Sequence, residues 1–178
     1  DSPRVLAFFR DTPHAASLRG NHEERHLEAQ RNLAPLGLAH ELARLQWSEE
    51  DYREACRYMA TLPRAQALDS ALVVHAYWEP GRLLERQRPD VLTGLPGGLE
   101  RLWSRHERPW YELYDGEQPL IVGHLDYLQT GHPFVHAERV WALDTGCCRG
   151  GRLTGLLLPD FKLVSVKAGA RYWQLQRE

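Results

Sequence analysis

The sequence predicts a mixed α/β fold in which two packed β-sheets are flanked by helices. Short apolar segments at 71–75 and 120–123 have no polar side that could face water, so each is expected to be a strand covered on both faces. Between such segments lie polar stretches with the start signals of helices. From residue 134 onward, strand-like segments alternate with tight turns, which is typical of antiparallel sheet.

Composition is that of a globular protein. A chain of 178 residues is long enough to bury a core, and we expect one domain over 1–178. The formal net charge of -2 gives no reason to expect nucleic acid or an anionic membrane as the main partner. Apolar runs are far too short to cross a bilayer and the start is no signal peptide, so we expect a cytoplasmic protein. The oligomeric state is left open.

The N-terminal part is expected to be mainly helical. Asp1-Ser2-Pro3 predicts a capped helix that starts almost at the first residue. A short strand is expected at 14–18, followed by a turn and a polar helix over 23–32. Ser48 opens a second clear helix that runs to about Ala60, because an acid three residues later suits a capped start.

Residues 79–118 are expected to form an insert or lid, with two short helices at 82–87 and 98–106 broken by proline and glycine. Its aromatic residues could stack on a nucleobase, but packing inside the lid is the expected use; they are Trp103, Trp110, Tyr111 and Tyr114. The remainder, 134–178, is expected to be a β-meander with strands at 141–144, 152–158 and 161–166.

The string Arg19-Gly20-Asn21-His22-Glu23 is the most informative motif, because it lies where a strand candidate meets a helix. The side-chain oxygen of Asn21 is a neutral, hard ligand for a divalent metal, and His22 could protonate a leaving oxygen beside it. Gly20 removes a Cβ that would obstruct so tight a turn, and Arg19 offers a planar fork for phosphate oxygens. The alternative is that Asn21 only caps the helix, with His22 and Glu23 in solvent.

This pentapeptide resembles the third signature of calcineurin-like metallophosphoesterases, a superfamily with serine/threonine phosphatases and diadenosine tetraphosphatases among its members. His75, at the end of a strand candidate, matches the lone histidine that follows in the family, and Gly123-His124 matches the Gly-His after it. Each histidine alone would more often be a core residue with its hydrogen bonds satisfied. Three strand ends with metal-type ligands together favour a site at the carboxyl edge of a sheet.

The resemblance implies a metal-dependent phosphatase that hydrolyses phosphate esters or anhydrides by a metal-bound hydroxide. In this interpretation Asn21, His75 and His124 hold one of two divalent ions, which would be Mn, Fe or Zn. His22 is the catalytic group that assists the leaving oxygen, and Arg19 binds the substrate phosphate. The substrate is a phosphorylated small molecule, a nucleotide or a phosphoprotein; a dinucleoside polyphosphate and a protein phosphoserine both stay open.

The ligands of the first metal are absent from this sequence. In the family they are an Asp-x-His and a bridging Gly-Asp that precede the Asn-His turn, and neither occurs here. We therefore expect the sequence to be the larger, C-terminal part of such an enzyme, with the N-terminal strands missing. The competing hypothesis is a non-catalytic remnant that binds phosphate or a protein partner.

Three further polar residues are ambiguous. Asp126 stands where some members of the superfamily have a second histidine, and it is expected to be a surface or strand-end acid. Asp144 is expected to bond the local backbone rather than a metal. Arg149 is a candidate contact to substrate.

Overall fold

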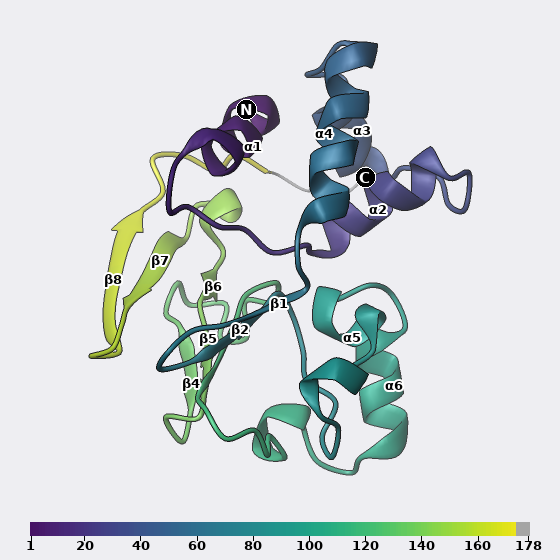
Figure 1. Ribbon diagram of the computed structural model, residues 1–178. Helices are drawn as coiled ribbons and strands as arrows, with labels where there is room; N and C mark the ends of the chain where they lie inside the picture. Colours follow the sequence, from purple (N-terminus) through teal and green to yellow (C-terminus); the bar gives the residue numbers. More distant parts are fainter. Residues whose placement is uncertain (174–178) are drawn as a thin grey trace, which may run out of the picture.

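The computed structural model describes residues 1–173 and contains two β-sheets with helices outside them (Figure 1). The predicted α/β fold with two sheets is confirmed. The helices are α1 (Ser2–Asp11), α2 (Asn21–Gln30), α3 (Leu38–Arg44), α4 (Glu49–Thr61), α5 (Pro89–Thr93) and α6 (Gly98–Arg105). Single 3₁₀ turns span Leu84–Arg86, Trp110–Glu112 and Cys147–Arg149. No helix within residues 1–173 is long and apolar enough to cross a membrane.

The larger sheet has five strands in the order β1-β2-β3-β5-β4. Its strands are β1 (Ala65–Ala67), β2 (Leu72–Val74), β3 (Leu120–Val122), β4 (Phe134–His136) and β5 (Val140–Ala142). The three central strands, β2, β3 and β5, run parallel, whereas β1 and β4 add to the edges in antiparallel pairs. The carboxyl ends of the three parallel strands therefore meet at one edge of this sheet.

The main core lies between this sheet and the 79–118 region. Leu120, Val122 and Val140 of the central strands are almost completely buried, as the apolar runs predicted. Residues from α5 and α6 pack on them, including Val91 and Leu102. The aromatic residues of the region mostly join this core as well, with Trp110 buried and Tyr111 and Tyr114 partly buried, while Trp103 is exposed.

The second sheet consists of β6 (Asp144–Thr145), β7 (Arg152–Leu157) and β8 (Lys162–Lys167), all antiparallel. The predicted strands at 152–158 and 161–166 are thus present. The region from residue 134 is shared between the two sheets, because β4 and β5 pair into the larger one. The final part of the expected meander, 174–178, lies outside the described residues.

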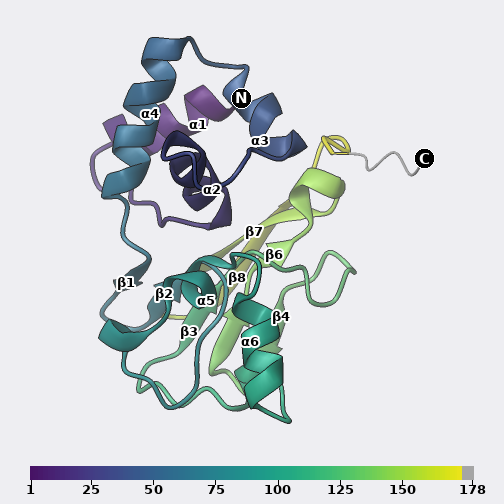
Figure 2. The same cartoon turned by 90° about the vertical axis from the view of Figure 1, so that its right-hand side faces the viewer.

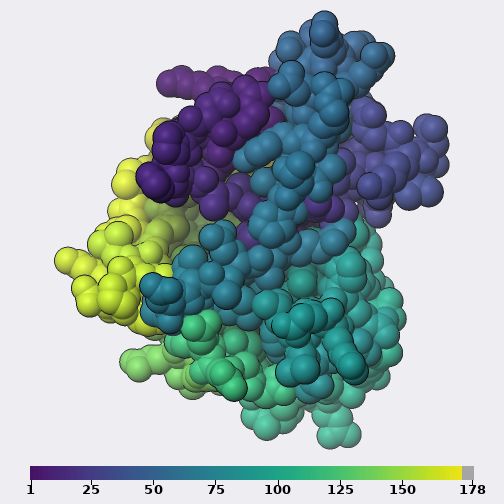
Figure 3. All heavy atoms as spheres, in the orientation of Figure 1, coloured from purple at the N-terminus to yellow at the C-terminus, as the bar shows by residue number. Residues whose placement is uncertain are grey.

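Helices α1 to α4 form a layer above both sheets (Figure 2). This layer has a small core of its own, made of Leu27, Tyr52, Ala55, Cys56 and Met59. Ser48 caps α4 as predicted, because its hydroxyl accepts a hydrogen bond from the Asp51 amide at 3.1 Å. In the space-filling view, α1 lies directly above the β7–β8 hairpin on one side of the molecule (Figure 3).

Two predictions about local structure are wrong. The segment 14–18 is not a strand; it is an irregular link between α1 and α2. Its apolar residues suggested a strand, but His14 has a positive φ of 65° and no strand within residues 1–173 pairs with the segment. The helix expected at 82–87 is only a 3₁₀ turn, and a short helix that was not predicted, α5, begins at Pro89.

Candidate functional site

Three polar side chains follow the ends of the three parallel strands. His75 comes directly after β2, and His124 and Asp144 each lie two residues past the ends of β3 and β5. Backbone pairing continues beyond the strands, since the Gly123 amide donates to the His75 carbonyl at 3.0 Å and the Leu143 amide donates to the Val122 carbonyl at 2.8 Å. The register therefore delivers the two imidazoles and the carboxylate to one edge of the sheet.

Asn21 reaches the same place from the helical layer. It is the first residue of α2, and its side-chain oxygen Oδ1 lies 3.0 Å from Nε2 of His75. The rings of His75 and His124 are 5.2 Å apart between centroids, at an interplanar angle of 62°. The three residues predicted as metal ligands thus lie together in space. In the sequence, His75 and His124 follow Asn21 by 54 and 103 positions.

Two glycines make room for the imidazole rings. A Cβ on Gly20 would lie 2.7 Å from two atoms of the His75 ring, and a Cβ on Gly94 would lie 2.7 Å from the His124 ring. Gly20 itself has a φ of -105°, which any residue adopts. The reason given for Gly20 from sequence, a tight turn, is therefore wrong; the close approach of His75 requires the glycine.

Burial keeps both histidines neutral. The pKa of His75 is lowered from its usual 6.5 to about 4, mainly by burial and further by the neighbouring imidazoles, while the Asp144 carboxylate opposes the shift. Burial also lowers the pKa of His124, again against the Asp144 carboxylate. A neutral imidazole has a free lone pair, so both rings are in the form that binds metal at neutral pH.

His22 lies beside this group and is exposed to solvent. It follows Asn21 in the first turn of α2, and its ring contacts the ring of His40 at a centroid distance of 4.5 Å. It also lines a cavity of about 320 Å³ between α1, α2 and α4, together with apolar residues such as Phe9 and Met59. An exposed imidazole next to buried ones is suited to transfer protons.

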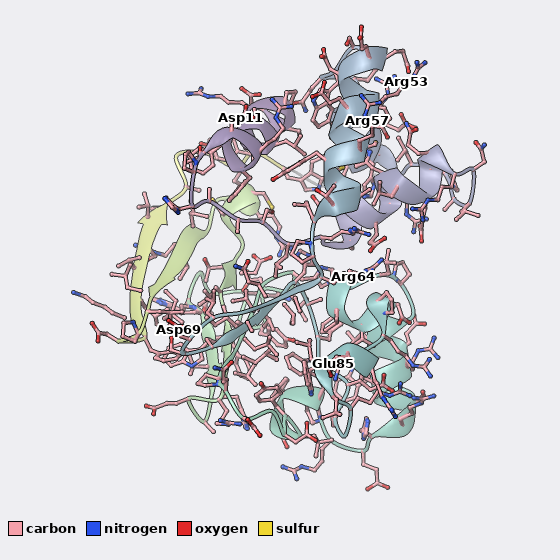
Figure 4. All side chains as sticks on the ribbon, in the orientation of Figure 1. Asp11, Arg53, Arg57, Arg64, Asp69 and Glu85 are labelled. Atoms are coloured by element: carbon pink, nitrogen blue, oxygen red, sulfur yellow. The ribbon has the colours of Figure 1, made fainter. Side chains whose placement is uncertain are left out.

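Arg19 is placed differently from the other motif residues. Its guanidinium donates to the Ala60 carbonyl at the end of α4 and pairs with Glu24 at 3.6 Å. The side chain is 12% exposed, and burial lowers its pKa. Arg64 binds the same Glu24 carboxylate at 2.7 Å, where the helical layer meets β1 (Figure 4). Arg19 therefore ties α2 to α4, and its contact to phosphate stays a prediction.

The residues at this edge fit a divalent cation. Two imidazole nitrogens and an amide oxygen are a donor set for Mn, Fe or Zn. Cis ligands held at about 2.1 Å by one octahedral ion lie about 3 Å apart, which is the separation of Asn21 Oδ1 and His75 Nε2. These three side chains are a small donor set. Within residues 1–173, no group of three or more His, Cys, Asp or Glu side chains is arranged to hold a metal ion.

Asp144 bonds local backbone as predicted, whereas Asp126 is more buried than its local sequence indicated. Asp144 does bond local backbone, since its Oδ1 accepts from the Gly146 amide at 3.0 Å, but its charge also acts on both histidines. Asp126 is not a surface acid: it is 8% exposed and accepts from the Gln129 amide at 2.8 Å. The position of Asp144 after a buried strand could have indicated that it lies near the two histidines. No residue near Asp126 in the sequence indicated that Asp126 is buried.

Sequence comparison finds three proteins named symmetrical bis(5'-nucleosyl)-tetraphosphatase, from the Corby, Lens and Philadelphia 1 strains of Legionella pneumophila. Each is 36% identical to this chain over 78 residues, which are 41% of the chain and 26% of the relative. The chain thus matches about a quarter of the length of these curated relatives. No family model matches the chain.

Structure comparison finds a crystal structure of a protein proposed to be a diadenosine tetraphosphatase. The TM-score is 0.61 at 23% identity, and the match covers 86% of this chain and 68% of that chain. At this identity the likeness shows the fold. Together, the two comparisons confirm the resemblance to diadenosine tetraphosphatases and agree with the calcineurin-like metallophosphoesterase branch.

Proposed function

We propose that this chain is part of a metal-dependent hydrolase that cleaves phosphoanhydride bonds in a nucleotide, with a dinucleoside polyphosphate as the favoured substrate. The observation that supports it most is the meeting of Asn21, His75 and His124 at the carboxyl edge of the parallel strands, with His22 beside them. The names of the matched relatives favour a nucleotide over a phosphoprotein.

Each residue has a role that its environment supports. Asn21 and the neutral rings of His75 and His124 would hold a divalent ion, which when bound supplies Lewis acidity and activates water. Gly20 and Gly94 would let the two rings take these positions, because a Cβ on either glycine would lie 2.7 Å from the ring beside it. Metal ligands held by close packing need little reorganisation when the ion enters.

His22 would donate a proton to the oxygen of the leaving phosphate. It is exposed on the side of the cavity of about 320 Å³, so a substrate can reach it. The contact with His40 restricts the orientation of its ring. Proton transfer from a positioned side chain contributes on the order of 10²- to 10⁴-fold to a reaction rate.

The test is the release of ADP from diadenosine tetraphosphate with MnCl₂, comparing the complete enzyme that contains this chain with its His22→Ala variant. We expect kcat to fall by about 10²-fold or more, with KM little changed, because a proton donor acts in the transition state. His132→Ala, a histidine outside the site, is the matched control and should retain wild-type kcat. Unchanged turnover in His22→Ala would remove His22 from the reaction, and no turnover by the complete enzyme would favour the non-catalytic alternative.

A further inference from the structure

A polar pocket of about 390 Å³ lies next to the candidate metal centre. It is formed by the segment that follows His124 and the loop that follows Asp144. Its walls include Asp126, Gln129, Thr130, Thr145, Gly146 and Arg149. We call it the Asp126 pocket; Asp126 is two positions from His124, and Thr145 directly follows Asp144.

One oxygen of the buried Asp126 carboxylate is fixed and the other is open. Oδ1 accepts the Gln129 amide at 2.8 Å, whereas no group within residues 1–173 donates to Oδ2. Oδ2 lies against the bare Cα of Gly146, where a Cβ would come within 2.8 Å of it. The residue is only 8% exposed, and Oδ2 is not among the buried oxygens that lack a partner, so it keeps contact with the solvent of the pocket and is an acceptor that a ligand hydroxyl can reach.

The pocket also has one positively charged lining residue, Arg149. Arg149 is exposed on the 3₁₀ turn Cys147–Arg149, and no carboxylate of residues 1–173 pairs with its guanidinium. The turn is held by backbone bonds, because the Arg149 amide donates to the Gly146 carbonyl at 2.9 Å. The Thr145 hydroxyl is already engaged, since it donates to the Arg152 carbonyl at 2.6 Å.

This combination excludes simple ligands. An inorganic anion would meet the Asp126 carboxylate, a metal cation would meet Arg149, and an apolar group would leave both charges without partners. A ligand with hydroxyl donors at one end and a phosphate at the other satisfies both sides. A sugar phosphate has this chemistry.

We propose that the Asp126 pocket binds the ribose of a nucleotide, with Asp126 Oδ2 accepting from the vicinal hydroxyls and Arg149 pairing with a phosphate. The direction in which the phosphates run, toward Asn21 and the two histidines, rests on the proposed function. The binding of the sugar itself does not, because it needs neither metal nor turnover.

The experiment measures binding of AMP and of 2',3'-dideoxy-AMP to the metal-free full chain by isothermal titration calorimetry. Wild type should bind AMP about 10- to 100-fold more tightly, the range expected for hydrogen bonds to a charged acceptor. Asp126→Asn retains Oδ1 for the Gln129 amide and places an amide NH₂ where Oδ2 was, so the preference should shrink to less than about twofold. Asp69→Asn, an exposed change in the turn between β1 and β2 (Figure 4), is the matched control and should preserve the preference.

A second variant tests the cation independently. Arg149→Ala should weaken AMP and 2',3'-dideoxy-AMP by the same factor, about tenfold, and leave their ratio unchanged. Three results would each overturn the proposal. Wild type could bind the two nucleotides with equal affinity, or AMP could fail to bind. A folded Asp126→Asn variant could also keep the full wild-type preference for AMP over 2',3'-dideoxy-AMP. If Asp126→Asn does not fold, the wild-type ratio and Arg149→Ala decide. Ribose preference without hydrolysis would reject the proposed function and leave the pocket assignment intact.

Discussion

Gly20→Ala is a sharp test of how the helical layer positions His75. The new Cβ would lie 2.7 Å from Cε1 and Nδ1 of the His75 ring, and ordinary contact begins at 3.4 Å. The ring or the backbone of Gly20 must therefore yield by about 0.7 Å, which disturbs the packing beside the Asn21–His75 contact. Insertion of a methyl group into a packed site costs about 1–3 kcal/mol. For a chain of this length that corresponds to a fall in Tm of about 2–12 °C.

The assay is thermal unfolding followed by circular dichroism, with Gly37→Ala as the matched control. Gly37 also caps a helix, has a similar extended backbone, and would place a Cβ 3.5 Å from His40, which is ordinary contact. Gly37→Ala should therefore change Tm much less. In a His75→Ala background the cost of Gly20→Ala should largely vanish, because the ring it clashes with is gone. Equal effects of the two glycine changes, or an undiminished cost without the His75 ring, would refute the reasoning.

Two further predictions concern buried charge. Glu79 is 3% exposed, and its carboxylate is shared by Arg82, Arg88 and Arg105, which are 32–43% exposed. Glu79→Gln should lower the free energy of unfolding by about 1–3 kcal/mol in urea titrations, since these arginines can rehydrate. Exposed Glu85→Gln is the control, and equal stability of the two variants would show that the cluster contributes nothing. Burial lowers the pKa of His26 to about 4 from an ordinary 6.5. Between these pH values the unfolded chain therefore binds more protons than the folded chain. The free energy of unfolding should thus fall as the pH drops from about 6.5 to about 4. His26→Gln should flatten this dependence, and an unchanged slope would assign it to other groups.

The helices and strands that could be predicted are those whose start, end or burial depends only on neighbouring residues in the sequence. The strands at β2 and β3 follow from apolar runs with no polar face, and α4 follows from a cap that needs only Ser48 and Asp51. The strand predicted at 14–18 is absent because a strand also needs a neighbour, and the long-range backbone bond just after the segment, from the Arg19 amide to the Pro63 carbonyl, is not a ladder.

The site shows the same division. The proximity of His75 and His124 could be expected because carboxyl ends of parallel strands converge. Asn21 lies with them for a different reason, because it comes from the start of α2 in the helical layer and no strand within residues 1–20 precedes it. The role of Gly20 depends on the His75 ring, 55 positions away, and the burial of Asp126 depends on the loop at Gly146. Such contacts depend on strand order and register, which no local pattern of residues contains. The metal-binding and catalytic roles of these residues stay predictions.

The most direct test of the metal centre is a titration of the ¹⁵N-labelled chain with ZnCl₂, observed through the ring nitrogens of its histidines by NMR. A site made of Asn21, His75 and His124 predicts that the His75 and His124 signals shift together and saturate at one equivalent, and that Asn21→Ala weakens both shifts. Shifts confined to histidines outside the site, such as His132 and His136, or separate saturation of His75 and His124, would show that these side chains do not bind a common ion.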